Sequence, residues 1–197
     1  MSNNVEKLED RVLDGLDISE GLRSFEGNEK AYLRILGIYA RETRLSLEKI
    51  DKVSEDNLSA YMVKMHGLKG ASLSIFANEV AKDAKALENA ALLGDVEYIS
   101  KHNKTFIDNT RSFVLSLEVM IADINSANPK KSRAEPDPVT LRKLLKACID
   151  YDVDEADEIM EELEEYDYES GNEFVAGLRE DVDLLQFNEI IEKLSAS

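Results

Sequence analysis

The sequence has few of the features that cross-link a protein or attach it to a membrane. It contains a single cysteine, Cys148, so an intramolecular disulfide framework is excluded. No stretch comes near the roughly 20 apolar residues that a membrane-spanning helix needs. The opening residues, MSNNVEKLED, have no apolar segment that could act as a signal peptide. We therefore expect a cytoplasmic protein that does not insert into a membrane.

Basic residues are also scarce, with 24 Lys and Arg against 41 Asp and Glu and a formal net charge of −17. Such a charge repels phosphate backbones and anionic lipid, so nucleic acid is not an expected partner. The imbalance is greatest in residues 129–197, which hold 8 basic and 20 acidic side chains. The C-terminal part is therefore distinctly acidic.

Only three prolines are present, and all of them fall within residues 126–138. Elsewhere apolar residues recur at spacings of three and four, which predicts helices throughout and no strand. We also expect no internal repeat. The helices that the pattern predicts are 5–13, 18–25, 29–52, 57–76, 78–93 and 96–126, followed by 139–149, 154–166, 171–182 and 187–194.

The proline-containing segment divides the chain. Residues 1–126 are expected to form one helical domain, 127–138 a linker, and 139–197 a small acidic helical extension. Apolar residues in the extension are spaced for an amphipathic helical unit. We expect this unit to pack on the first domain or to mediate self-association.

The segment around His66 carries the chemistry. On a helix, the side chains of Tyr61, Met65, Leu68 and Ser72 fall on one stripe, which we predict to face the core. His66 points about 150° away from that stripe, so its imidazole is expected to face solvent.

Neighbours of His66 on the helix surface suggest access by another protein. Met62 and Leu73 would place apolar surface beside the ring, and exposed apolar surface usually marks a docking site. Gly70 removes a side chain from the approach path, although glycine within a helix costs about 1 kcal/mol relative to alanine. Lys69 could neutralise a phosphoryl group and disfavour a second positive charge on the ring.

The run HGLKGAS, followed by SIFANEVAKDAKALE, resembles the histidine-containing phosphotransfer (HPt) family, and GLDISEGLRSFEGNEKAYLRILGIYARE resembles the first helices of that family. The resemblance covers about residues 10–125. It implies an all-α, antiparallel up-down four-helix bundle with short N-terminal helices. It also implies that the phosphorylated histidine is His66, with Lys69 and Gly70 as the basic and small residues beside it. Where the family commonly has glycine ten residues after the histidine, this chain has Phe76.

The resemblance further implies a phosphocarrier rather than an enzyme. His66 would take a phosphoryl group from the aspartyl phosphate of a receiver domain and pass it to another receiver. The partners would be response-regulator receivers or a hybrid histidine kinase, docking over Met62, Leu73 and Phe76. No cofactor is expected on this chain, because the magnesium ion belongs to the receiver. The sequence leaves the cognate receiver and the direction of transfer open.

Other assignments fit the residues less well. His102 lies between Lys101 and Asn103 on a polar helix face and is expected to be solvated. Two histidines and a distant cysteine do not make a metal site, and the acidic run 150–169 lacks the glycine and spacing of an EF-hand. A kinase would need a glycine-rich phosphate-binding lobe, which is missing from the sequence. The remaining alternative is a non-phosphorylated helical adaptor that docks receiver or kinase domains.

Overall fold

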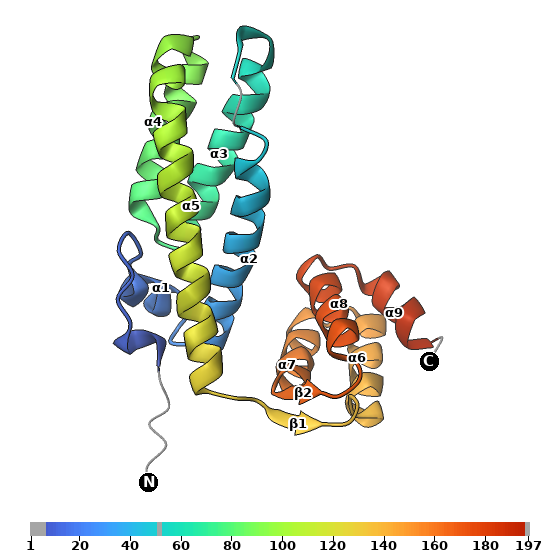
Figure 1. The fold of residues 1–197 in the computed structure, drawn as a ribbon. Coiled ribbons are helices and arrows are strands. Elements are labelled where there is room, and N and C mark those ends of the chain that lie inside the picture. The colour runs from blue at the N-terminus through green and yellow to red at the C-terminus, as the bar shows by residue number, and fades with distance from the viewer. Residues whose placement is uncertain (1–6, 51–52, 196–197) are drawn as a thin grey trace. The chain divides into compact units, whose positions relative to one another are not determined.

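The computed structural model describes residues 7–50 and 53–195, which are mainly helical. The expected all-α class is therefore confirmed at the level of helix content. The chain divides into two compact units, Met1–Asn128 and Pro129–Ser197, with the division inside the segment predicted to be a linker (Figure 1). Within the described residues, no helix combines the length and apolar character needed to cross a membrane.

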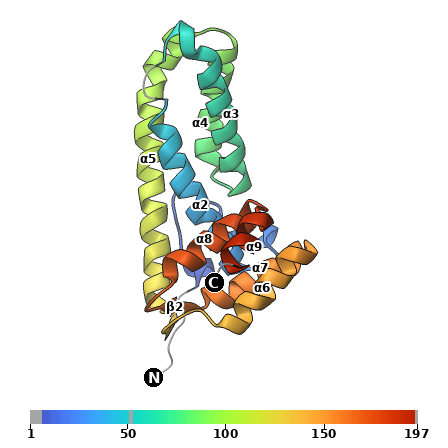
Figure 2. The same cartoon turned by 90° about the vertical axis from the view of Figure 1, so that its right-hand side faces the viewer.

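Long helices dominate the N-terminal unit. Helix α2 packs against α3 and α5, and α4 packs against α3 and α5, while the short α1 packs against α2. The hairpin of α3 and α4 is visible in both views (Figure 1, Figure 2). The elements are η1 (Leu8–Asp10), α1 (Ile18–Ser24), α2 (Glu29–Leu47), η2 (Glu55–Asn57), α3 (Leu58–Ser74), α4 (Asn78–Leu92) and α5 (Val96–Ala127).

Capping side chains set the starts of three of these helices. Asp17, Asn28 and Asp95 each accept a hydrogen bond from the backbone N–H three residues later, at the first turns of α1, α2 and α5. The helix ends were predicted less well. The helix expected over 5–13 is only the turn η1 among the described residues, with 5 and 6 outside them. Helix α2 stops at Leu47 rather than at residue 52, which also lies outside the described residues.

The C-terminal unit contains two strands, which corrects the expectation of none. It consists of β1 (Lys131–Arg133), α6 (Pro138–Asp150), α7 (Val153–Glu164), β2 (Tyr166–Tyr168), α8 (Asn172–Asp183) and α9 (Phe187–Ser195). The strands pair in parallel, with Lys131 opposite Tyr166 and Arg133 opposite Tyr168. The guanidinium of Arg133 also lies 3.5 Å from the centre of the Tyr166 ring, a cation–π contact. Part of the predicted linker is thus folded.

An internal repeat, not expected from the sequence, organises this unit. The hairpin α6–α7 is repeated by α8–α9 at an offset of 34 positions, so that buried Leu144 corresponds to buried Leu178. In the first turn the N–H of Asp152 donates to the carbonyl of Ala147 (2.9 Å). In the second, the N–H of Gln186 donates to the carbonyl of Asp181 (2.7 Å), 34 positions later. The two hairpins share their backbone geometry and burial pattern, although equivalent positions can hold different residues.

Candidate functional site

Helix α3 is held at a fixed rotation by buried hydrogen bonds. The Tyr61 hydroxyl donates to Oδ1 of Asn103 on α5 (2.9 Å), and the Tyr39 hydroxyl shares a hydrogen bond with Oγ of Ser72 (2.9 Å). The Tyr32 hydroxyl donates to the carbonyl of Ile75 at the end of the helix (2.9 Å). Buried polar groups that lose a partner are costly, so these bonds specify which face of α3 points inward.

The expected stripe faces the core and His66 faces outward. Tyr61, Met65, Leu68 and Ser72 are all buried. The side chain of His66 is 70% exposed. The structure therefore places a solvent-accessible imidazole in the middle of a helix that is anchored at both ends.

His66 is one member of a three-residue cluster with Lys69 and Glu88. Its Nδ1 atom lies 2.6 Å from Oε1 of Glu88 on α4. Lys69 Nζ donates to the other carboxylate oxygen, Oε2 (2.7 Å), and lies 3.3 Å from Nδ1. The carboxylate thus bridges the ring and the ammonium, and the two side chains predicted to work together are in contact.

The charges in this cluster determine which ring nitrogen of His66 carries the proton. Hydrogen bonds from Lys69 and then from His66 hold the pKa of Glu88 below its ordinary value, so the carboxylate is ionised near neutral pH and can only accept. Its short contact with Nδ1 therefore requires Nδ1–H to donate. In neutral imidazole the other nitrogen, Nε2, then carries the free lone pair.

Glu88 is the member of this cluster that the sequence did not reveal. It lies 22 positions after His66 and on the next helix. The two meet because α3 and α4 pack antiparallel around the short turn at 75–77. One signal was present: Glu88 directly follows the buried Leu87, so its carboxylate lies at the edge of the α4 face that packs inward.

The predicted docking residues are exposed to different degrees. Leu73 is 52% exposed, and a Cβ atom built on Gly70 would meet nothing within 4 Å. Met62, in contrast, is half-buried and packs against the core. The exposed apolar side chain on that side of the helix is Val63, three residues before His66 and 66% exposed. The apolar surface near the ring therefore contains Val63, which was not predicted.

Phe76 terminates α3 with a left-handed backbone. Its φ is 64°, and the N–H of Ala77 donates to the carbonyl of Ser72 (2.8 Å), a pattern that usually has glycine at this position. The ring is half-buried. Helix α3 therefore ends in a conformation that favours glycine, with a bulkier residue in the left-handed position.

His102 is exposed on α5, as expected, and its ring lies against that of Tyr98 in a tilted arrangement, with a centroid distance of 4.2 Å. Across residues 7–50 and 53–195, no three His, Cys, Asp or Glu side chains gather as they would around a metal ion.

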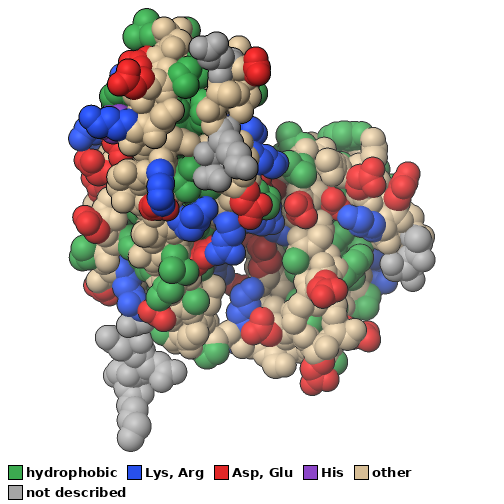
Figure 3. Space-filling model, turned by 45° about the horizontal axis from the view of Figure 1, so that its top comes forward, with side chains coloured by type: hydrophobic (Ala, Val, Ile, Leu, Met, Phe, Trp, Pro, Cys, Tyr) green, Lys and Arg blue, Asp and Glu red, His purple; other side chains and the backbone are tan. Residues whose placement is uncertain are grey.

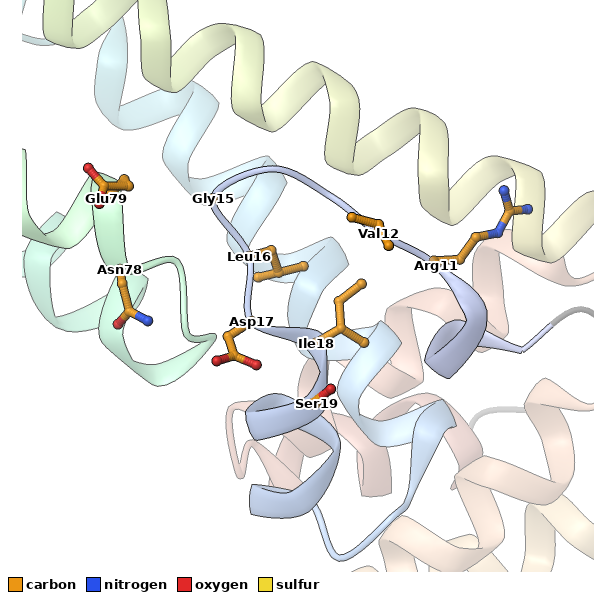
Figure 4. A pocket seen from close by; sticks show the side chains of 9 residues that line it. All are labelled: Arg11, Val12, Gly15, Leu16, Asp17, Ile18, Ser19, Asn78 and Glu79. Atoms are coloured by element: carbon orange, nitrogen blue, oxygen red, sulfur yellow. The ribbon is translucent and has the colours of Figure 1, made fainter.

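A shallow pocket of about 400 Å³ lies elsewhere in the N-terminal unit, between the loop before α1 and the start of α4 (Figure 4). None of its lining residues belongs to the His66 cluster, so it is separate from this site. Its lining residues are Arg11, Val12, Gly15, Leu16, Asp17, Ile18, Ser19, Asn78 and Glu79.

Comparison of the chain with protein-family models, with curated proteins and with solved structures found no match.

Proposed function

We propose that the N-terminal unit is a histidine phosphotransfer module of a two-component phosphorelay, in which helices α2 to α5 form an antiparallel up-down four-helix bundle. The packing of α2 on α3 and α5, and of α4 on the same two helices, supports this arrangement. The observation that carries the function is an exposed imidazole whose Nδ1 is engaged by Glu88 while its ring is open to solvent.

The reaction follows from that geometry. The Nε2 lone pair attacks the phosphorus of a receiver's aspartyl phosphate in line, the N–P bond forms, and the P–O bond to the aspartyl group breaks. The receiver's carboxylate leaves with the electron pair. The Nδ1 proton stays in its hydrogen bond to Glu88, whose negative charge stabilises the positive charge that develops on the ring. The reverse sequence returns the group to a receiver.

Neighbouring residues have distinct roles in this proposal. Lys69 holds Glu88 in position and supplies positive charge near the incoming phosphoryl oxygens. Gly70 leaves the surface open one turn beyond the ring, and Leu73 and Val63 provide apolar contact for the receiver.

The chain acts here as a phosphocarrier in the cytoplasm rather than as a kinase or hydrolase. Its partners are receiver domains of response regulators or of a hybrid histidine kinase. The magnesium ion used in transfer resides on the receiver, whose aspartate undergoes the chemistry.

Two donors test the proposal. Phosphoramidate can phosphorylate an accessible imidazole with release of ammonia, and receivers of the source organism charged with labelled phosphate supply the protein donor. The chain should acquire acid-labile, base-stable label from both. With the receiver as donor, His66→Gln should abolish labelling, whereas the matched His102→Gln should leave it unchanged. Full labelling of His66→Gln would contradict the proposal, and receiver binding without transfer would favour the adaptor function.

A further inference from the structure

The two helical hairpins of the C-terminal unit turn at the same end. Helix α6 follows β1, α7 leads into β2, and α8 follows β2, so the paired strands mark one end of the unit. The α6–α7 and α8–α9 turns must therefore both lie at the opposite end. Contacts across the turns agree, because the Tyr151 ring lies 5.8 Å from that of Phe187 and its hydroxyl is 3.5 Å from Oδ1 of Asn188.

This end, named the turn face, is apolar and exposed. Its large side chains come from both turns, and each is between 45% and 64% exposed. Figure 3 shows hydrophobic side chains open to solvent on this unit, interspersed with acidic ones. The exposed side chains are Ile149, Tyr151, Val153, Leu184 and Leu185.

Two of these side chains belong to residues whose backbone is strained. Tyr151 and Leu185 occupy equivalent positions of the repeat, with φ of 56° and 55°. Glycine is preferred there, because a Cβ atom disfavours the left-handed conformation. Because Leu185 is 60% exposed, burial of its side chain offsets little of this strain. Glycine at the same position would relieve it. Stability of the unit therefore does not explain why this site carries a leucine.

The surroundings of the turn face are acidic. Residues 147–178 contain no Lys or Arg, and the two turns and their adjoining helix ends carry Asp150, Asp152, Asp154, Glu155, Asp183 and Glu189. A second copy of the chain placed on this face would bring like charges together, and an anionic lipid surface would be repelled. A complementary partner would present apolar side chains to the turn face and basic side chains to its acidic surroundings.

We propose that the turn face docks a basic amphipathic helix of another protein. Apolar residues of that helix, spaced at three and four, would contact Tyr151, Leu184 and Leu185, and its Lys and Arg side chains would face the acidic rim. This inference is independent of the phosphotransfer chemistry of His66.

A labelled synthetic helix with a leucine stripe and lysine flanks tests the proposal by fluorescence anisotropy against the full chain. We expect saturable binding that weakens strongly from 0.1 M to 1 M salt. A peptide of the same composition in scrambled order should bind at least about tenfold more weakly, as expected when one or two buried apolar anchors are lost. Equal binding of the two peptides would overturn the proposal.

Leu185→Gly separates docking from folding, because the two effects have opposite signs. The substitution should weaken peptide binding about tenfold through loss of an apolar anchor. It should also stabilise the unit, so that buried Cys148 reacts more slowly with a thiol reagent. Val139→Ser, an exposed apolar residue at the opposite end of α6, is the control and should leave binding unchanged. Undiminished binding by Leu185→Gly would contradict the proposal, as would a dimer in sedimentation that this substitution dissociates.

Discussion

Oε1 of Glu88 lies 2.6 Å from Nδ1 of His66, although the two residues are on different helices. Lys69 completes the arrangement by binding the second carboxylate oxygen at 2.7 Å. An otherwise ordinary surface histidine is thereby given a defined tautomer.

Removing the Glu88 carboxylate should change the tautomer of His66. In Glu88→Ala, Nδ1 loses its acceptor, so the proton should redistribute toward Nε2 and occupy the nucleophilic nitrogen. Hydrogen bonds to charged groups contribute about 1.5–3 kcal/mol, so we expect phosphotransfer to slow by about tenfold to hundredfold. Nitrogen-15 shifts of the histidine ring and transfer rates measure the two effects. Glu88→Gln should be intermediate, with His102 as an internal reference; an unchanged tautomer in Glu88→Ala would show that Glu88 does not set it.

The titration of Glu88 should depend on Lys69. The pKa of Glu88 lies below the ordinary 4.5, owing first to Lys69 and second to His66. Because the folded chain binds this proton less readily than the unfolded chain, the cluster's contribution to stability is present above pH 4.5 and lost as the pH falls through the lowered pKa. In Lys69→Ala, the carbon-13 carboxyl titration should move upward toward 4.5. Lys82→Ala, which alters only an exposed pair with Glu79, should leave it in place.

The Tyr61–Asn103 hydrogen bond should stabilise the N-terminal unit. Tyr61→Phe leaves Oδ1 of Asn103 buried without its donor, which costs about 1–3 kcal/mol. Urea unfolding measures the change. Tyr98→Phe, at a partly exposed tyrosine, should cost less than about 0.5 kcal/mol. Equal effects of the two substitutions would show that the Tyr61–Asn103 hydrogen bond does not help to position α3.

Gly70 should matter for the access of a receiver to His66 rather than for the stability of helix α3. Neither Gly70 nor Gly37 has an atom within 4 Å of a built Cβ, so alanine fits at both and should stabilise its helix by up to about 1 kcal/mol. Only Gly70→Ala should slow transfer from a phosphorylated receiver, because only it narrows the approach to His66. Thermal unfolding and transfer rates of the two variants give the comparison. Equal transfer rates would show that Gly70 has no part in docking.

Periodicity was sufficient to predict the buried face of α3 and the exposure of His66, because both follow from the angle between successive residues on one helix. Glu88 was not predictable in this way, since its contact with the ring depends on how α3 and α4 pack. Strand β1 was missed because its three residues are all exposed and show no alternating pattern. Strand β2 was missed because three residues are too few to establish the alternation of a strand. The helical repeat was missed because equivalent positions hold different residues, as in Tyr151 and Leu185.

Phosphotransfer through Nε2 of His66 is best tested by locating the phosphoryl group on the chain. After brief reaction with a charged receiver, mass spectrometry of the intact chain and nitrogen-15 NMR of the labelled histidines can count the groups and locate the N–P bond. The proposed mechanism requires one phosphoryl group, bonded to Nε2 of His66. Phosphorylation at Nδ1, or at His102 instead, would contradict it.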